Sequence, residues 1–418
     1  MTHLAGSDPE ATDILHAERE RQQGTLNLIA SENHASAAVR EATGSVMADK
    51  YAEGYPGRRW YCGCEQVDRA ERLAVERARA LFGAAHANVQ PHAGTTANLA
   101  VYLAALDPGD TIMGMDLAHG GHLSHGRSAN LSGMAYRVAH YGVSERDERI
   151  DLDGVRQAAR KARPRLIVAG ASAYPRAIDF DAFGEIAREV GAYLLSDIAH
   201  IAGLVVGGVH PSPLPASTFV TTTTHKTLRG PRGAIILCGA EWASQIDAAV
   251  FPGLQGGPFP HEILARAVAL REAATPAFAD YARRIVANAR ALAAGLAEKG
   301  WRLVSGGTDN HLLLVDLRSR QAELTGRRAA EWLARTGLIA NKNKIPFDRR
   351  GPAEASGVRF GTPAVTTRGL GPAEMARLAA WIDDVLNSGG DDDRLARIRA
   401  GVGELCRQFP IPDAPAGS

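Results

Sequence analysis

Between Glu65 and Gly233, strand-like runs alternate with helical runs, and this pattern restricts the fold more than any other feature of the chain. A helical pattern over Glu65–Phe82 comes first, and short apolar runs separated by helical segments follow it. Such alternation is typical of a doubly wound α/β layer, in which helices cover both faces of a mostly parallel sheet. The expected strands are Thr111–Met115, Arg165–Ala169, Tyr193–Ser196 and Ala234–Cys238.

The 418 residues divide into three expected parts. Residues 1–59 form an N-terminal helix, predicted over Glu18–Asn33, and an extended arm. Residues 60–274 form the large domain. A long helix expected over Pro258–Ala274 leads out of this domain. Residues 275–418 form a smaller α/β domain. Its expected elements are the helices Asp280–Lys299, Gly326–Thr336 and Ala373–Leu386 and the strands Arg302–Ser305 and Leu312–Val315.

Composition excludes several classes of function. A formal net charge of +1 provides no basic field for nucleic acid or an anionic membrane. No apolar run approaches membrane-spanning length, and Met1–Gly24 lacks the apolar core of a signal peptide. Of the four cysteines, Cys62 and Cys64 are separated by one glycine, which suits neither a disulfide nor a zinc site. We therefore expect reduced thiols, no bound metal and a cytoplasmic location.

Lys226 lies in a segment rich in threonine and glycine, with no helical apolar stripe around it. If this lysine is partly enclosed, burial disfavours its charged form. A neutral amine can form a Schiff base with an aldehyde, which is how enzymes hold pyridoxal phosphate (PLP). A loop lysine that reaches water is the alternative interpretation of this segment alone.

A second segment, Ala87–Leu103, begins like a strand, passes through proline and glycine, and continues as a helix. Thr95 or Thr96 is placed to cap that helix, and Gly94 lets the backbone approach a ligand closely. The free N–H groups of the first helical turn would then bind a phosphate. An ordinary capped helix is the simpler alternative.

A third segment places Asp197 at the end of the apolar run Tyr193–Ser196. Ligands in parallel α/β sheets bind beyond the carboxyl ends of the strands. A carboxylate at this position can keep the pyridine nitrogen of PLP protonated, so that the ring accepts electrons from an amino acid α-carbon. His200, three residues further on, can hydrogen-bond the ring hydroxyl or the imine. A capping or turn role is the alternative for Asp197.

Longer runs carry a resemblance to a known family. The chain resembles the serine hydroxymethyltransferases, which are fold-type I PLP enzymes with an aspartate-aminotransferase-like fold. The similarity extends from about Asn27 to Ile382. The matching runs are Leu28–Asn33, Lys50–Gly57, Leu117–Leu123, Val220–Gly233, Phe251–Pro258 and Ser305–His311.

The resemblance implies roles for individual residues around PLP. Lys226 would bond the cofactor, Asp197 would hold the pyridinium, and Gly94 with Thr95 would bind the phosphate. His122 would stack on the ring. The further cofactor-side and catalytic residues that it implies are Ser172, His200, Thr223, His225, Tyr51, Gly256 and Gly257.

For the amino acid substrate, the resemblance assigns the carboxylate to Arg359, helped by Ser31 and Tyr61. Guanidinium matches carboxylate geometry where lysine does not. Glu53 would meet the serine hydroxyl and move a proton. In the family, Tyr51, Glu53 and Gly257 reach the site from the other subunit, so the resemblance implies a homodimer, with a tetramer possible.

The implied reaction interconverts L-serine and glycine through an external aldimine and a glycine carbanion, with tetrahydrofolate as one-carbon acceptor. Leu117, Gly121, Leu123 and Asn343 match the folate-side positions. The chain departs from the family pattern at Ala93–Thr96, Trp60, Lys344 and Gly351–Ala353, and the last of these lacks an aromatic residue that helps to hold folate.

These departures leave two alternatives. The first is a specialised relative, namely a β-hydroxy amino acid aldolase, a threonine transaldolase or an α-methylserine hydroxymethyltransferase. The second is a non-catalytic binding paralogue, against which the retention of Lys226, Asp197, Arg359 and Glu53 argues.

Overall fold

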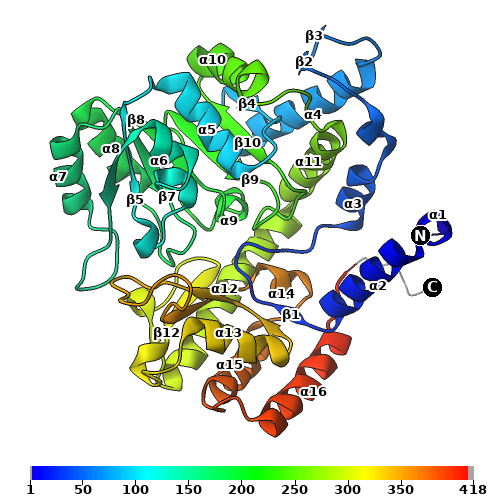
Figure 1. Cartoon of the computed structure of the whole chain (residues 1–418). Helices are drawn as coiled ribbons and strands as arrows, with labels where there is room; N and C mark the ends of the chain where they lie inside the picture. The colour runs from blue at the N-terminus through cyan, green and yellow to red at the C-terminus, as the bar shows by residue number, and fades with distance from the viewer. Residues whose placement is uncertain (1, 413–418) are drawn as a thin grey trace.

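The computed structural model describes residues 2–412, and a seven-stranded sheet organises its larger part (Figure 1). The strand order is β4-β10-β9-β8-β7-β5-β6, and only β10 runs antiparallel to its neighbours. The sheet confirms the expected doubly wound, mostly parallel layer. Its strands are β4 His86–Asn88, β5 Thr111–Met115, β6 Arg137–Tyr141, β7 Leu166–Gly170, β8 Tyr193–Asp197, β9 Phe219–Thr223 and β10 Ala234–Cys238.

Helices pack on both faces of this sheet because its central strands are apolar on both sides. In β7, Leu166 and Val168 join one core while Ile167 and Ala169 join the other, as the alternation of side chains along a strand requires. The first core is covered by α5 Gly94–Ala105 and α10 Ala243–Ala248. The second is covered by α4 Glu65–Phe82, α7 Leu152–Ala162, α8 Phe180–Val190, α9 Ala202–Val206, α11 Pro260–Ala273 and the start of α12 Pro276–Glu298.

A smaller antiparallel sheet, in the order β11-β12-β15-β14, has its own core below the large sheet in Figure 1. The start of α12 packs on the large sheet and its end packs into the core of the smaller unit, so this helix joins the two units. The division at residues 59/60 and 274/275 stays a prediction. The elements are β11 Arg302–Leu303, β12 Leu312–Asp316, β14 Asn341–Asn343, β15 Gly357–Gly361, α13 Gly326–Arg335, α14 Pro363–Thr367, α15 Pro372–Leu386 and α16 Asp392–Gln408.

The N-terminal helix differs from the prediction. Instead of Glu18–Asn33, α2 spans Pro9–Gln23, because Asp8 caps its first turn and the helix ends at Gly24. The following residues are extended, since β1 Leu26–Asn27 pairs in parallel with β13 Leu338–Ile339 of the smaller unit. The arm then continues through α3 Ala37–Thr43 to the hairpin of β2 Gly54–Tyr55 and β3 Arg58–Arg59.

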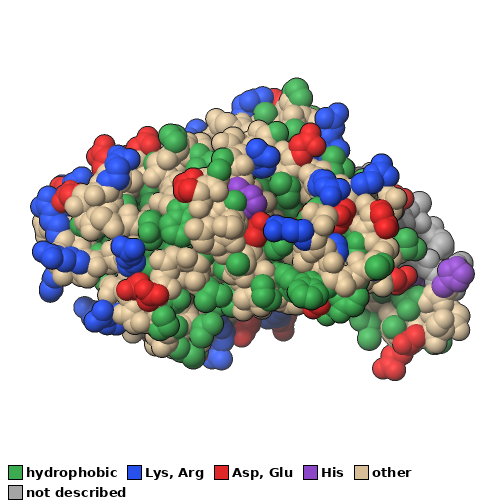
Figure 2. Space-filling model, turned by 90° about the horizontal axis from the view of Figure 1, so that it is seen from above, with side chains coloured by type: hydrophobic (Ala, Val, Ile, Leu, Met, Phe, Trp, Pro, Cys, Tyr) green, Lys and Arg blue, Asp and Glu red, His purple; other side chains and the backbone are tan. Residues whose placement is uncertain are grey.

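The surface offers no strongly one-sided charge on the face shown in Figure 2, where Lys and Arg are interspersed with Asp and Glu. Within residues 2–412, none of the helices combines the length and apolar character needed to cross a bilayer.

Candidate active site

Helix α5 begins at Gly94 without a side-chain cap, so the predicted threonine cap is wrong. Ala93 takes the capping position in an extended conformation, and Thr95 falls inside the first turn. The first N–H groups of the helix therefore lack a side-chain acceptor, and they favour an anion. A larger residue would not fit at position 94, because a Cβ there would lie 2.7 Å from the Thr223 methyl group.

The Asp197 carboxylate lies at the carboxyl end of β8 and lines a cavity. Its Oδ2 accepts hydrogen bonds from His125 Nε2 and Asn98 Nδ2, each at 2.9 Å, and its Oδ1 accepts one from the Ala199 amide at 3.1 Å. Burial by itself would raise the pKa of this carboxyl group. The bond from His125, the nearby imidazoles and the bond from Asn98 outweigh burial and hold the pKa well below its usual value. Asp197 is thus an ionised carboxylate.

His125 and Asn98 were missed by the sequence analysis. Only weak signals pointed to these two residues: His125 follows His122 by three residues, and Asn98 lies one turn into α5.

Lys226 follows strand β9, is partly buried and lines a cavity. Burial lowers the pKa of its amine to about 8, against the opposing effect of Asp197 and with smaller contributions from Arg359 and Arg232. Roughly a tenth of this amine is therefore neutral at pH 7, far more than for an ordinary lysine, and the neutral form is the nucleophile.

Burial favours the neutral form of three histidines that line the site, namely His122, His200 and His225. It lowers the pKa of His122 to about 4 and that of His225 to about 3, and it places that of His200 well below the usual value. His200 Nδ1 shares a hydrogen bond with His311 Nε2 at 3.2 Å, and Arg232 donates to His225 Nε2 at 3.2 Å. These rings can donate and accept hydrogen bonds without bringing positive charge into the site.

Arg359 lies on β15, at the border between the two units. Its Nη1 donates to the Ser172 carbonyl at 2.6 Å and its Nε donates to Asn341 Oδ1 at 3.2 Å. Among residues 2–412, no carboxylate forms an ion pair with this guanidinium, and burial lowers its pKa to about 10. A buried cation without a counter-ion is prepared for a carboxylate ligand.

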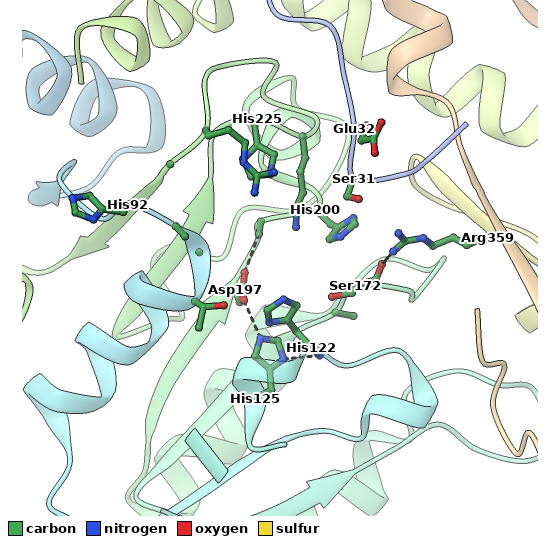
Figure 3. Close-up of a pocket in the computed structure, with 18 residues that line it drawn as sticks. Ser31, Glu32, His92, His122, His125, Ser172, Asp197, His200, His225 and Arg359 are labelled. Carbon is green, nitrogen blue, oxygen red and sulfur yellow. Dashed lines mark hydrogen bonds and ion pairs between the residues drawn. The ribbon is translucent and has the colours of Figure 1, made fainter. Parts of the chain in front are cut away.

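These side chains surround one cavity of about 420 Å³ (Figure 3). Asp197 points into it from the end of β8, His122 and His200 point into it from segments that follow β5 and β8, and Arg359 closes one side. The predicted residues that line it are Ser31, Gly94, Thr95, His122, Ser172, Asp197, His200, His225, Lys226 and Arg359. The lining residues that the sequence analysis did not predict are Glu32, His92, Ala93, His125, Ala171, Ala199, Arg232 and Gly233.

Other predicted residues do not line this cavity. Thr223 is buried beside it, where its hydroxyl donates to the Ala199 carbonyl at 3.3 Å. Asn343 lies on β14, and Leu117 and Leu123, which were predicted to lie on the folate side, are exposed. Gly121 follows the short helical turn Leu117–His119.

Five further predicted residues form a separate cluster, the arm cluster, where the arm and the loop that follows it meet the segment before α11. The rings of Tyr51 and Tyr61 meet edge to face with centroids 5.3 Å apart, and 56% and 46% of their surfaces are exposed. Glu53 raises the pKa of the Tyr61 phenol through its charge. A Cβ on Gly256 would lie 3.1 Å from Glu53 Oε1, and one on Gly257 would lie equally close to the Tyr51 ring. This cluster is assembled but lies outside the lining of the chain's own cavity.

Comparison with known proteins decides the family. The model of the family described as serine hydroxymethyltransferase matches residues 4–382. A serine hydroxymethyltransferase from Synechococcus sp. (strain JA-3-3Ab) is 57% identical over 98% of this chain and 96% of its own length. The chain belongs to the serine hydroxymethyltransferase family. It is accordingly an enzyme of the one-carbon transferase class, and its large parallel sheet with flanking helices agrees with the fold-type I architecture of that family.

Proposed function

We propose that this chain binds PLP in the cavity around Lys226 and interconverts L-serine and glycine, with tetrahydrofolate as the one-carbon acceptor. The observation that carries the proposal is the convergence of three ionisable groups on one cavity: the amine of Lys226, the ionised carboxylate of Asp197 and the guanidinium of Arg359, which has no carboxylate partner among residues 2–412. An amino acid that must be held by its carboxylate beside an electron-accepting ring needs this set.

The residues present fit PLP. The uncapped start of α5 at Gly94 and Thr95 suits its phosphate, and Asp197 suits its pyridinium nitrogen. His122 would stack on the ring, His200 would hydrogen-bond near the ring oxygen, and Ser172 would offer a further hydroxyl beside the cofactor. Once bound, PLP supplies an electron sink for the negative charge that develops on the amino acid α-carbon.

The protein's own groups would supply attachment, orientation and proton transfer. Lys226 Nζ is the nucleophile that attaches the cofactor, helped by its lowered pKa. Arg359 holds the substrate carboxylate with two parallel hydrogen bonds, and Ser31 assists it. His225, neutral beside Lys226, orients the amine without adding charge.

The exposed arm cluster supports a homodimer. Tyr51, Glu53, Tyr61, Gly256 and Gly257 are brought together outside the lining of their own cavity. We propose that they complete the cavity of a second copy, in which Glu53 meets the hydroxyl of serine. A tetramer would pair two such dimers. The four cysteines are unpaired, which supports a cytoplasmic location.

The folate site would lie at the mouth of the cavity, at Leu117, Gly121, Leu123 and Asn343. Although Ala353 offers no aromatic ring there, Phe347 is 39% exposed and contacts His119 with ring centroids 4.8 Å apart. His119 lies in the same turn as Leu117. An aromatic surface is therefore still present beside the proposed folate side. The 57% identical relative carries the hydroxymethyltransferase name, which favours this reaction over the aldolase and α-methylserine alternatives.

Serine-to-glycine conversion with and without tetrahydrofolate tests the proposal. We expect strong stimulation by folate and slower cleavage of threonine, allo-threonine and α-methylserine measured in parallel. Cleavage of threonine or α-methylserine that exceeds serine conversion and ignores folate would show that the specialised-relative alternative is correct.

We expect Glu53→Gln to retain the yellow cofactor and to slow serine cleavage by roughly 10²-fold or more, since general acid–base groups contribute about that much. Steady-state rates and the absorbance spectrum measure the two effects. Equal serine rates would remove Glu53 from the mechanism.

Mixed dimers test whether sites are shared. Glu53→Gln and Lys226→Ala chains, unfolded and refolded together, should regain activity, because one of the two sites in a mixed dimer has both residues intact. Activity that stays at the level of the separate variants would show that each site uses a single chain.

The lowered pKa of Lys226 predicts how cofactor attachment depends on pH. Only the neutral amine attacks an aldehyde, so the attachment rate should rise with pH through about 8 and then level off. An ordinary lysine would keep gaining rate up to its usual pKa of 10.5. The measurement is the growth of yellow absorbance when PLP is added to the cofactor-free protein. A midpoint near the ordinary lysine value would contradict the enclosure of Lys226.

A further inference from the structure

The guanidinium of Arg59 is buried beneath the β2–β3 hairpin between two carboxylates. Its side chain is 4% exposed, and those of Glu71 and Asp68 are 2% and 12% exposed. Arg59 Nε donates to Asp68 Oδ1 at 2.8 Å, and Nη2 donates to Glu71 Oε2 at 2.6 Å. The carboxylates compensate the buried charge and leave the third nitrogen for other partners.

That third nitrogen binds the backbone on both sides of Glu53. Arg59 Nη1 donates to the carbonyls of Ala52 at 2.9 Å and Gly54 at 2.7 Å. Gln90 Nε2 adds a second donor to the Gly54 carbonyl at 2.9 Å and also donates to Glu71 at 2.8 Å. The carbonyl of Glu53 itself accepts from the Trp60 amide at 3.0 Å. All three successive carbonyls are therefore held, and the Glu53 side chain extends toward Gly256 and Tyr61.

Stability alone gives little reason for this arrangement. A buried ion pair contributes little net stability, because desolvation offsets the attraction, and apolar residues of similar volume often serve as well. Fixing the backbone of a residue that must meet a substrate atom does require directional bonds, since displacement by about 1 Å can cost 10²-fold in rate.

We propose that Arg59, held by Glu71 and Asp68, is a positioning residue that fixes Glu53 for its encounter with the serine hydroxyl in the site of the second copy. The inference rests on the proposed function, because it assigns Glu53 the role given there. Arg59 acts through the backbone of residues 52–54 and does not touch the substrate.

The test is a double-mutant cycle for serine conversion that combines Arg59→Lys and Glu53→Gln. Lysine keeps the charge between the two carboxylates but lacks the Nη1 nitrogen that donates to both carbonyls. We expect Arg59→Lys to lower kcat roughly 10- to 100-fold while KM for serine changes less and the cofactor spectrum is kept. In the Glu53→Gln background, the same substitution should cost almost nothing further.

Arg72→Lys is the matched control, because Arg72 pairs with the same Asp68 at 3.4 Å but does not reach the carbonyls of residues 52–54. It should leave kcat unchanged. If Arg59→Lys does not fold, Gln90→Met removes one donor to the Gly54 carbonyl while sparing the ion pairs, and it enters the same cycle.

The outcomes separate the two hypotheses. Equal costs of the Arg59 substitution in both backgrounds would overturn the positioning role while leaving the proposed function intact. Absence of serine conversion in the unmodified enzyme would overturn the proposed function, and the role of Arg59 with it.

Discussion

Replacing Lys226 with alanine is expected to lower serine-to-glycine conversion by on the order of 10⁴-fold, which effectively abolishes turnover. The variant loses the amine whose pKa burial lowers to about 8, and with it the lysine that the cavity offers for covalent attachment of PLP. Borohydride reduction followed by denaturation should leave cofactor on the unmodified chain and none on the variant. Initial rates measure the loss of activity.

Lys161→Ala is the control for this experiment, because Lys161 is an exposed lysine near the end of α7. It should keep both the colour and the activity. A Lys226→Ala protein that converts serine at undiminished rates, or that retains cofactor after reduction and denaturation, would refute the assignment of the lysine.

Arg359→Lys is expected to lower kcat/KM for serine by roughly 30- to 5000-fold, since the loss of one partner of a buried charge pair costs about 2–5 kcal/mol. An ammonium cannot reproduce the two parallel hydrogen bonds of a guanidinium. Because Arg359 also donates to the Ser172 carbonyl, the same change would loosen the contact between the two units at the cavity. Most of the effect should appear in KM, with the cofactor spectrum retained.

Arg328→Lys provides the comparison. Arg328 is exposed on α13 of the same unit and lies over the ring of Trp332. Its substitution should leave both kinetic constants unchanged. If Arg359→Lys bound serine as well as the unmodified enzyme, the substrate carboxylate would have to bind elsewhere.

Local sequence pattern predicted most of the scaffold. The helix Glu65–Phe82 and the strands Thr111–Met115 and Ala234–Cys238 have the predicted bounds. The spacing of apolar residues reflects which side chains are buried, so it predicted these elements. The N-terminal helix was misplaced, because the segment after Gly24 pairs with a strand more than three hundred residues away, and no local pattern reports such a partner.

At the site, the sequence alone determined the chemical identity of the groups: a lysine, an aspartate at a strand end, a glycine at the start of a helix and an arginine among glycines. The tertiary structure decided their environment. His125 meets Asp197 across 72 positions, and the Ser172 carbonyl meets Arg359 across 187. The lowered pKa of Lys226 exists only when the fold removes water from around it. Desolvation and hydrogen bonding act through space, so they follow from which residues the fold brings together and not from their order in the chain.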